Sequence, residues 1–250
     1  MKALLLTFLL LFPFLCPVAQ DINALVKEAD RLEAIPNENA AFTKFKEVLM
    51  AKPTHLYALS KCSELCIRIG KRQADDKLRD SYYEAGKIYA ATALKIDPVN
   101  SDASCAMAMV LGRSTMSKSG KEKILNAKEI KKYVDISLKT NPNNFKAWHV
   151  LGRWHYEISN LNFFERSAVK LFYGGLPESS LAQAIAAFEK SQSITSGFIL
   201  NYFEMAKAYH RNDDNAKAVA ALKTMLTLPN QTEDDPGIKA EGKKLLNALQ

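Results

Sequence analysis

The sequence predicts an all-α solenoid of about five helical hairpins followed by a C-terminal capping helix. Three observations predict this fold class. Similar segments end in proline or serine along the chain, small and apolar residues recur at fixed offsets after each of these stops, and a second set recurs at fixed offsets before them. Because proline cannot continue a helix, each stop is expected to separate one pair of helices from the next.

The first helix of each hairpin is indicated by the residues that follow a stop. Four stops end at Pro53, Pro98, Pro142 and Ser196, and a fifth ends at Pro229. Residues at +6, +9, +10 and +13 from the first four stops share one face of a helix, and the small residue at +10 is expected where two helices approach most closely. The sets are Leu59, Cys62, Ser63 and Cys66; Ser104, Met107, Ala108 and Leu111; Trp148, Leu151, Gly152 and His155; and Tyr202, Met205, Ala206 and Tyr209.

The second helix is indicated by small and apolar residues twelve, eight and five positions before each stop, such as Ala41, Phe45 and Val48. These patterns divide residues 21–250 into one helical repeat domain. The expected pairs lie near 22–52, 54–97, 99–141, 143–195 and 197–229, with a capping helix at 233–249. A terminal helix of this kind shields the last apolar face of a solenoid from water.

Two resemblances follow from these residues. The first helix of the fourth hairpin, with Trp148, Leu151 and Gly152, is similar to the tetratricopeptide repeat (TPR). The runs AWHVLGRWHYEISNLNFFERSAVKLFYGGLP, AIAAFEKSQSI and LPNQTEDDPGIKAEGKKLL resemble the regulator of microtubule dynamics family. The resemblance implies a TPR-like solenoid and, by analogy with animal members, association with microtubules or organelle membranes.

Residues 1–20 have the layout of a secretory signal peptide, with Lys2, an apolar run over 3–15, and the small residue Ala19. We expect cleavage there and an exported protein, periplasmic or secreted, away from cytosolic microtubules. The alternative is a retained anchor or a lipoprotein signal at Cys16, although Leu15 is bulky where lipoprotein processing favours a small residue.

The charge balance is mildly basic. The chain has 34 basic and 27 acidic residues, for a net charge of +7, and the basic residues are spread along it. This balance favours acidic protein or peptide partners, or contact with a membrane surface, and argues against nucleic acid.

No pattern of catalytic residues is present. Cys62 and Cys66 lack a second ligand pair and occupy repeat core positions, and the six-residue spacing of His149 and His155 is not that of a metalloprotease helix. Phosphate-binding glycine loops and nucleophile elbows are also missing from the sequence. We therefore expect a non-enzymatic protein without a cofactor or a metal site.

Charged and aromatic residues are expected to line the concave groove formed by the first helices. At +15 from the stops stand Arg68, Arg113, Glu157 and Arg211, and at +11 stand Glu64, Met109, Arg153 and Lys207. Arginine binds carboxylates in a bidentate manner, so we expect the groove to bind an acidic segment. The alternative is a solvated face with ordinary ion pairs within helices. The partner-binding candidates are Arg113, His149, Arg153, Tyr156, Phe203, Lys207 and Arg211.

The insert at 161–177 is rich in aromatic residues and contains Arg166 and Lys170. It either packs over its own solenoid or docks on a membrane or a partner helix, so a membrane-surface or lipid-interacting protein is the alternative function. Gly174 and Gly175 are expected to end its helix with a left-handed turn.

Overall fold

The computed structural model describes residues 21–114 and 120–250, and these residues contain twelve α-helices and no β-strand. The expected signal peptide, residues 1–20, lies outside the described residues. The helices are α1 (Ile22–Ala34), α2 (Glu38–Ala51), α3 (Leu56–Lys71), α4 (Asp76–Ile96), α5 (Ser101–Ser114), α6 (Gly120–Thr140), α7 (Phe145–Ser159), α8 (Phe163–Tyr173), α9 (Leu181–Ile194), α10 (Ile199–Arg211), α11 (Asn215–Thr227) and α12 (Asp235–Ala248).

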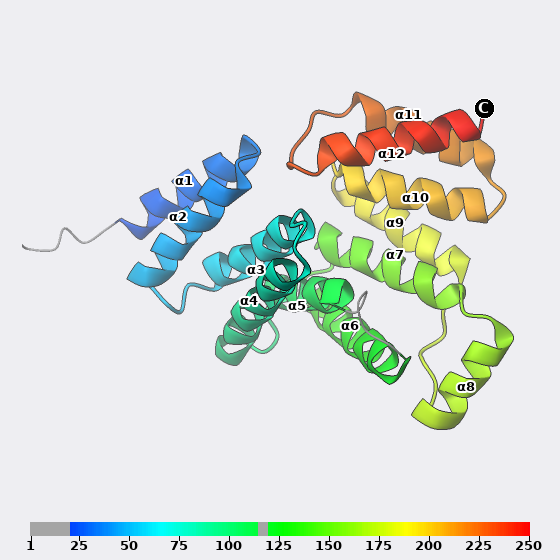
Figure 1. Ribbon diagram of the computed structural model, residues 1–250, viewed down its shortest axis with the longest axis horizontal. Helices are drawn as coiled ribbons and strands as arrows, with labels where there is room; N and C mark the ends of the chain where they lie inside the picture. Colours follow the sequence, from blue (N-terminus) through cyan, green and yellow to red (C-terminus); the bar gives the residue numbers. More distant parts are fainter. Residues whose placement is uncertain (1–20, 115–119) are drawn as a thin grey trace, which may run out of the picture.

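The helices form five antiparallel hairpins and a terminal helix, which confirms the predicted fold class. The hairpins are α1–α2, α3–α4, α5–α6, α7–α9 and α10–α11, and α12 packs on α11 and α10. Figure 1 shows them following one another along a curved path. Helix α8 is inserted between the two helices of the fourth hairpin and stands apart from the other helices (Figure 1). Within the described ranges, no helix is long and apolar enough to cross a membrane.

The stops found in the sequence end helices for local reasons. Lys52 and Asp97 precede prolines and have extended backbones, with φ and ψ of −142° and 88° and of −138° and 95°. Proline disfavours the helical conformation of the residue before it, so α2 and α4 end there. The following helix then begins with a side-chain cap, as where the Asn144 side chain accepts a hydrogen bond from the Ala147 N–H.

The core consists of the small and apolar positions that repeat along the chain. Ala41, Phe45, Cys62 and Cys66 are fully buried. Burial raises the pKa of the Cys66 thiol to about 12, so this cysteine behaves as a small apolar residue, as expected from its repeat position. In the fourth hairpin, a Cβ at Gly152 would lie 2.6 Å from the ring of Phe188, so α7 and α9 approach closely only because residue 152 lacks a side chain.

We expect Gly152→Ala to destabilise the protein. The added methyl group must displace the buried Phe188 ring, which costs about 2 kcal/mol, and the higher helix propensity of alanine offsets about 1 kcal/mol of this. Gly112→Ala is the matched control, because its Cβ would meet no atom within 4 Å. The urea concentration at the midpoint of unfolding should fall for Gly152→Ala and rise for Gly112→Ala. Equal shifts of the midpoint in the two variants would contradict this account of helix packing.

Candidate partner-binding site

Five of the seven candidate residues form one cluster where α7 and α10 face each other. Their centre is the carboxylate of Glu204, which is 5% exposed and which the sequence did not single out. Arg153 Nη1 lies 2.5 Å from Glu204 Oε1, and Lys207 Nζ lies 2.9 Å from Glu204 Oε2. Burial raises the pKa of Glu204, but the charges of Arg153 and Lys207 outweigh this effect and hold the pKa below its ordinary value. Arg153 and Lys207 are therefore held in ion pairs with Glu204 and are not free cations.

Two aromatic rings complete this cluster. Lys207 Nζ lies 5.7 Å from the centre of the Tyr156 ring and 5.5 Å from that of Phe203. The Arg211 guanidinium lies 4.8 Å from the Tyr156 ring centre and donates hydrogen bonds to the Tyr156 carbonyl oxygen and Ser159 Oγ, both at 2.9 Å. These contacts hold Arg211 against α7 without using a carboxylate, and all five side chains are partly exposed.

Arg113 is separate from this cluster. It lies in the last turn of α5, is partly exposed, and has no ion pair with any residue that the structure describes. Its repeat position is the same as that of Arg68 on α3, which binds Glu33 on α1 and lies 3.4 Å from Glu38 Oε1 on α2. The same position in the repeat therefore carries an arginine with two carboxylate partners in one hairpin and an arginine with none in another.

His149 is the one candidate that lies in the core. It is 7% exposed and packs between Phe188 and Phe198, with ring centres 5.7 Å and 4.9 Å away. Its Nδ1 lies 3.1 Å from Asn201 Oδ1, while Asn201 Nδ2 donates to the Phe188 carbonyl oxygen. Because the Asn201 amide nitrogen donates to Phe188, the amide oxygen is the atom that faces His149. This oxygen can only accept a hydrogen bond, so His149 Nδ1 carries the proton. His149 therefore supports α7 from within and is not available on the groove surface.

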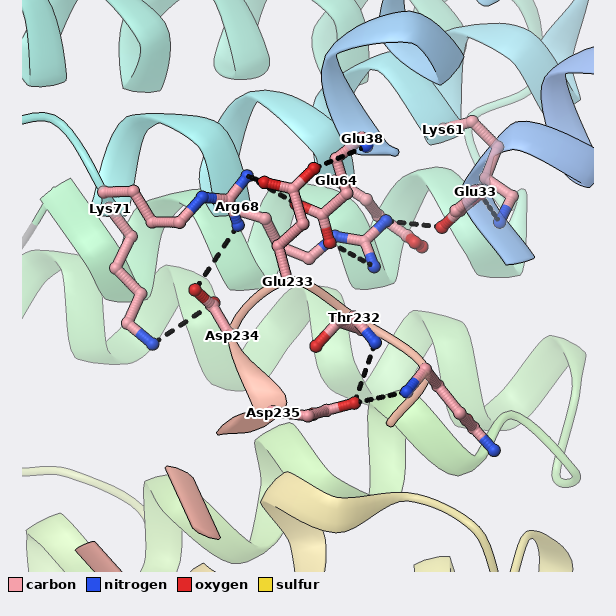
Figure 2. A network of polar contacts seen from close by, with 12 residues as sticks. Glu33, Glu38, Lys61, Glu64, Arg68, Lys71, Thr232, Glu233, Asp234 and Asp235 are labelled. Atoms are coloured by element: carbon pink, nitrogen blue, oxygen red, sulfur yellow. Dashed lines mark hydrogen bonds and ion pairs between the residues drawn. The ribbon is translucent and has the colours of Figure 1, made fainter. Parts of the chain in front are cut away.

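A second network joins the two ends of the solenoid, and sequence reasoning missed it. Figure 2 shows the loop before α12 reaching α2 and α3. Glu233 Oε1 accepts a hydrogen bond of 2.7 Å from the Glu38 N–H, at the N-terminus of α2, where a carboxylate is favoured. Asp234 lies 3.2 Å from Lys71 Nζ and 3.3 Å from Arg72 Nη1.

Arg72 lies at the centre of this second network. Its Nη2 lies 2.7 Å from Glu38 Oε2 and 3.2 Å from Glu233 Oε2, and the Glu38 side chain is completely buried. We call Glu38, Arg72, Glu233 and Asp234 the clasp. Asp235 shapes the loop, because its Oδ2 accepts hydrogen bonds of 2.7 Å from the Gln231 and Thr232 N–H groups (Figure 2).

The sequence contains a weak signal for the clasp. Lys71 ends α3 and Arg72 follows it, and the acidic run 233–235 leads into α12. The charges are complementary, but more than 160 residues separate them along the chain. No local rule pairs two such segments, so the contact follows only from the three-dimensional path of the solenoid.

Known proteins resemble this chain in sequence and in fold. The family model of regulator of microtubule dynamics protein 1-3 matches residues 25–250. The chain belongs to this family. Regulator of microtubule dynamics protein 3 of Xenopus laevis is 26% identical over 227 residues, which are 88% of this chain and 48% of that protein. Regulator of microtubule dynamics protein 1 of Caenorhabditis elegans is 25% identical over 181 residues, 72% of this chain and 80% of that protein.

The chain spans about half the length of some members of the regulator of microtubule dynamics family, such as the Xenopus protein. Among solved structures, a thermophilic TPR protein of Thermus thermophilus matches with a TM-score of 0.65 at 13% identity, covering 90% of this chain and 99% of that one. This likeness concerns the fold alone. Both resemblances stated from the sequence, to the TPR and to the regulator of microtubule dynamics family, are confirmed.

Within the described residues, no group of acidic, histidine or cysteine side chains is placed to hold a metal ion.

We expect Arg72→Met to destabilise the protein by about 2 kcal/mol, because it removes a charged partner from the buried Glu38 carboxylate. Arg31→Met is the control. Arg31 lies 2.7 Å from Glu28, but both side chains are largely exposed, and such surface pairs contribute about 0.5 kcal/mol. Urea unfolding measures both changes, and similar losses for the two variants would show that the clasp contributes no more than a surface ion pair.

His149 should make stability depend on pH. Burial lowers its pKa to about 4, whereas the pKa of an unfolded histidine is about 6.5. Between these values the unfolded chain binds a proton that the folded chain does not, so the folded state loses stability as the pH falls. From pH 7 to pH 5 the free energy of unfolding should fall by about 2 kcal/mol through this residue.

The matched variant for this pH dependence is His149→Gln, which does not titrate. Its free energy of unfolding should fall less than that of the unsubstituted protein between pH 7 and pH 5. This range lies above the ordinary carboxylate pKa values, so Glu33, whose pKa is about 2, does not contribute to the difference. Identical pH profiles for the two proteins would show that His149 keeps an ordinary pKa.

Proposed function

We propose that this chain is a non-enzymatic protein-interaction scaffold that binds an extended, carboxylate-bearing segment of another protein along its concave face. Membership of the regulator of microtubule dynamics family and the TPR-like fold support the scaffold role. In such solenoids the first helices of successive hairpins form a continuous inner surface on which an extended segment can lie. In the second to fifth hairpins these helices are α3, α5, α7 and α10.

The observation that carries the proposal is the unequal pairing of arginines at one repeat position. Arg68 is surrounded by the carboxylates of Glu33 and Glu38. Arg113 and Arg211 occupy the same position in later hairpins, are partly exposed, and have no carboxylate partner within the described residues. A partner with two suitably spaced carboxylates would give Arg113 and Arg211 the partners that Arg68, in the second hairpin, has within its own chain.

The neighbouring cluster is suited to positioning such a segment. Glu204 already neutralises Arg153 and Lys207, so these two side chains are held in place before a partner arrives. The rings of Tyr156 and Phe203 provide rigid contact area beside them. Recognition then depends on where the two remaining arginines stand rather than on a general excess of positive charge.

The relatives of this chain are named regulators of microtubule dynamics, which makes microtubules a candidate partner. The expected signal peptide would carry the chain away from cytosolic microtubules, so we propose a protein partner in an exported compartment instead. Protease protection in intact cells, followed by N-terminal sequencing, tests this location independently of binding.

We expect a displayed library of random twelve-residue peptides, selected on the full chain, to be enriched in segments with two or more Asp or Glu residues. Arg113→Glu should weaken the binding of a selected peptide at least about tenfold, because it replaces an attractive contact with a repulsive one. Fluorescence anisotropy with a labelled selected peptide measures the loss.

Lys223→Glu is the matched control. It makes the same charge change at an exposed residue of α11, a second helix, and should leave peptide binding unchanged. Urea unfolding of both variants checks that the fold is intact. Selected peptides without carboxylates, or equal losses at Arg113 and Lys223, would contradict the proposal.

A further inference from the structure

Helix α8 presents its apolar side chains to solvent. Phe163, Phe164, Leu171 and Phe172 are 77%, 80%, 77% and 71% exposed. The sequence left open whether the insert packs over its own solenoid, and the exposure of these four side chains shows that they do not pack on it. Figure 1 shows α8 standing beyond the end of the α7–α9 hairpin. Four large apolar side chains together on one exposed helix mark an interaction surface.

The helix is amphipathic with its apolar side turned outward. At 100° per residue, Phe163, Phe164, Leu171 and Phe172 fall within one half of the helix circumference, together with Ser167. The opposite half carries Val169, which is buried, and Arg166, which donates hydrogen bonds to the carbonyl oxygens of Leu161, Ile158 and Ser159. The inner side therefore attaches α8 to the protein, and the outer side remains uncovered.

Both ends of α8 are fixed. Asn162 and Glu165 form a capping box at the start, and Gly174, with φ of 71°, ends the helix in the left-handed conformation expected from the sequence. At this end Lys128 Nζ on α6 lies 2.5 Å from the Tyr173 carbonyl oxygen. The apolar side is thus a preformed surface joined to α6.

The surface beside α8 is basic. Helices α6 and α8 together carry eight basic and four acidic side chains. Lys128, Lys131 and Lys132 line a hollow of about 480 Å³ between α6 and the turn at 174–177, together with Asp135. Lys131 pairs with Asp135 and Lys132 with Glu129, and both carboxylates are exposed, so the net positive charge of the two helices, rather than any single free cation, gives this surface its sign. Lys170 lies on α8 itself and is exposed. An apolar aromatic surface bordered by lysines matches the region between the acyl chains and the anionic headgroups of a lipid membrane.

We propose that α8 and the adjoining lysines of α6 dock the protein on an anionic lipid membrane, with α8 lying along the membrane surface. Eleven residues rise roughly 16 Å, about half the thickness of the hydrocarbon core, so a lengthwise position fits the helix. The positive charge of the patch favours anionic lipid over a second copy of the chain, because two such patches repel each other. This surface is distinct from the concave face and leaves it free for a protein partner.

A fluorophore on the apolar side of α8 tests the proposal. In the full chain carrying Cys16→Ser, Ser167→Cys provides one reactive thiol, since Cys62, Cys66 and Cys105 are buried. With an environment-sensitive NBD label, emission should increase and shift to the blue on adding phosphatidylglycerol vesicles, and should not change with phosphatidylcholine vesicles. The same label at Thr224→Cys, an exposed position on α11, should not respond. Because the readout is local, it does not depend on whether residues 1–20 also bind lipid.

Two further variants separate the contributions to docking. Lys132→Glu with Lys170→Glu should weaken the response at residue 167 at least about thirtyfold in lipid concentration, because two attractive charges are replaced by two repulsive ones. Phe164→Ser with Leu171→Ser should abolish it, whereas Leu78→Ser with Ile88→Ser, two exposed apolar residues of α4, should not. The proposal would be overturned if the label responded to vesicles at neither residue 167 nor residue 224, or equally at both. It would also be overturned if the emission at residue 167 rose with protein concentration in the absence of lipid, a result that would indicate self-association.

Discussion

The contact on which the molecule's shape depends is the clasp formed around Arg72. A solenoid is held together by contacts between neighbouring repeats, so its two ends are ordinarily independent. Here one guanidinium contacts carboxylates of α2 and of the loop before α12, and it thereby joins the first hairpin to the last. We propose that this closure restrains the curvature of the solenoid and with it the separation of Arg113 and Arg211. In the proposed function, a restrained groove would select partners by the spacing of their charges.

The fold could be predicted because its determinants are local and repeated. The extended backbone of Lys52 follows from the next residue alone, and the close approach of α7 and α9 follows from Gly152 and Phe188, which both stand at repeat positions. Each hairpin needs to match only its neighbour, so a periodic sequence carries almost all the information that such a fold requires. Helical periodicity also shows which side of α7 faces inward.

Periodicity does not give the depth of a side chain or its distant partners. His149 stands beside groove positions in sequence, but Phe198, from the segment before α10, covers its ring. Arg153 is neutralised by Glu204, fifty-one residues away, and nothing in α7 indicates that partner. In the insert that contains α8, the sequence indicated an aromatic segment without showing whether it packs on the protein. That choice depends on the Arg166 hydrogen bonds to backbone carbonyl groups. The sequence therefore placed five of the seven candidate residues together, but it gave neither the burial of His149 nor the partner of Arg153.

The concave face and the outer side of α8 differ in how many of their side chains already have partners within the chain. On the inner face most cations have partners, because Glu204 pairs with Arg153 and Lys207 while Glu38, Glu233 and Asp234 pair with Arg72. A charge that is already paired in a partly buried site gains little from another anion, so a ligand there must reach the arginines that lack a carboxylate. On α8, by contrast, nothing within the described residues covers the aromatic rings. We therefore propose that the stronger drive to associate lies at α8, whereas the discrimination between partners depends on the arginines of the concave face that lack a carboxylate.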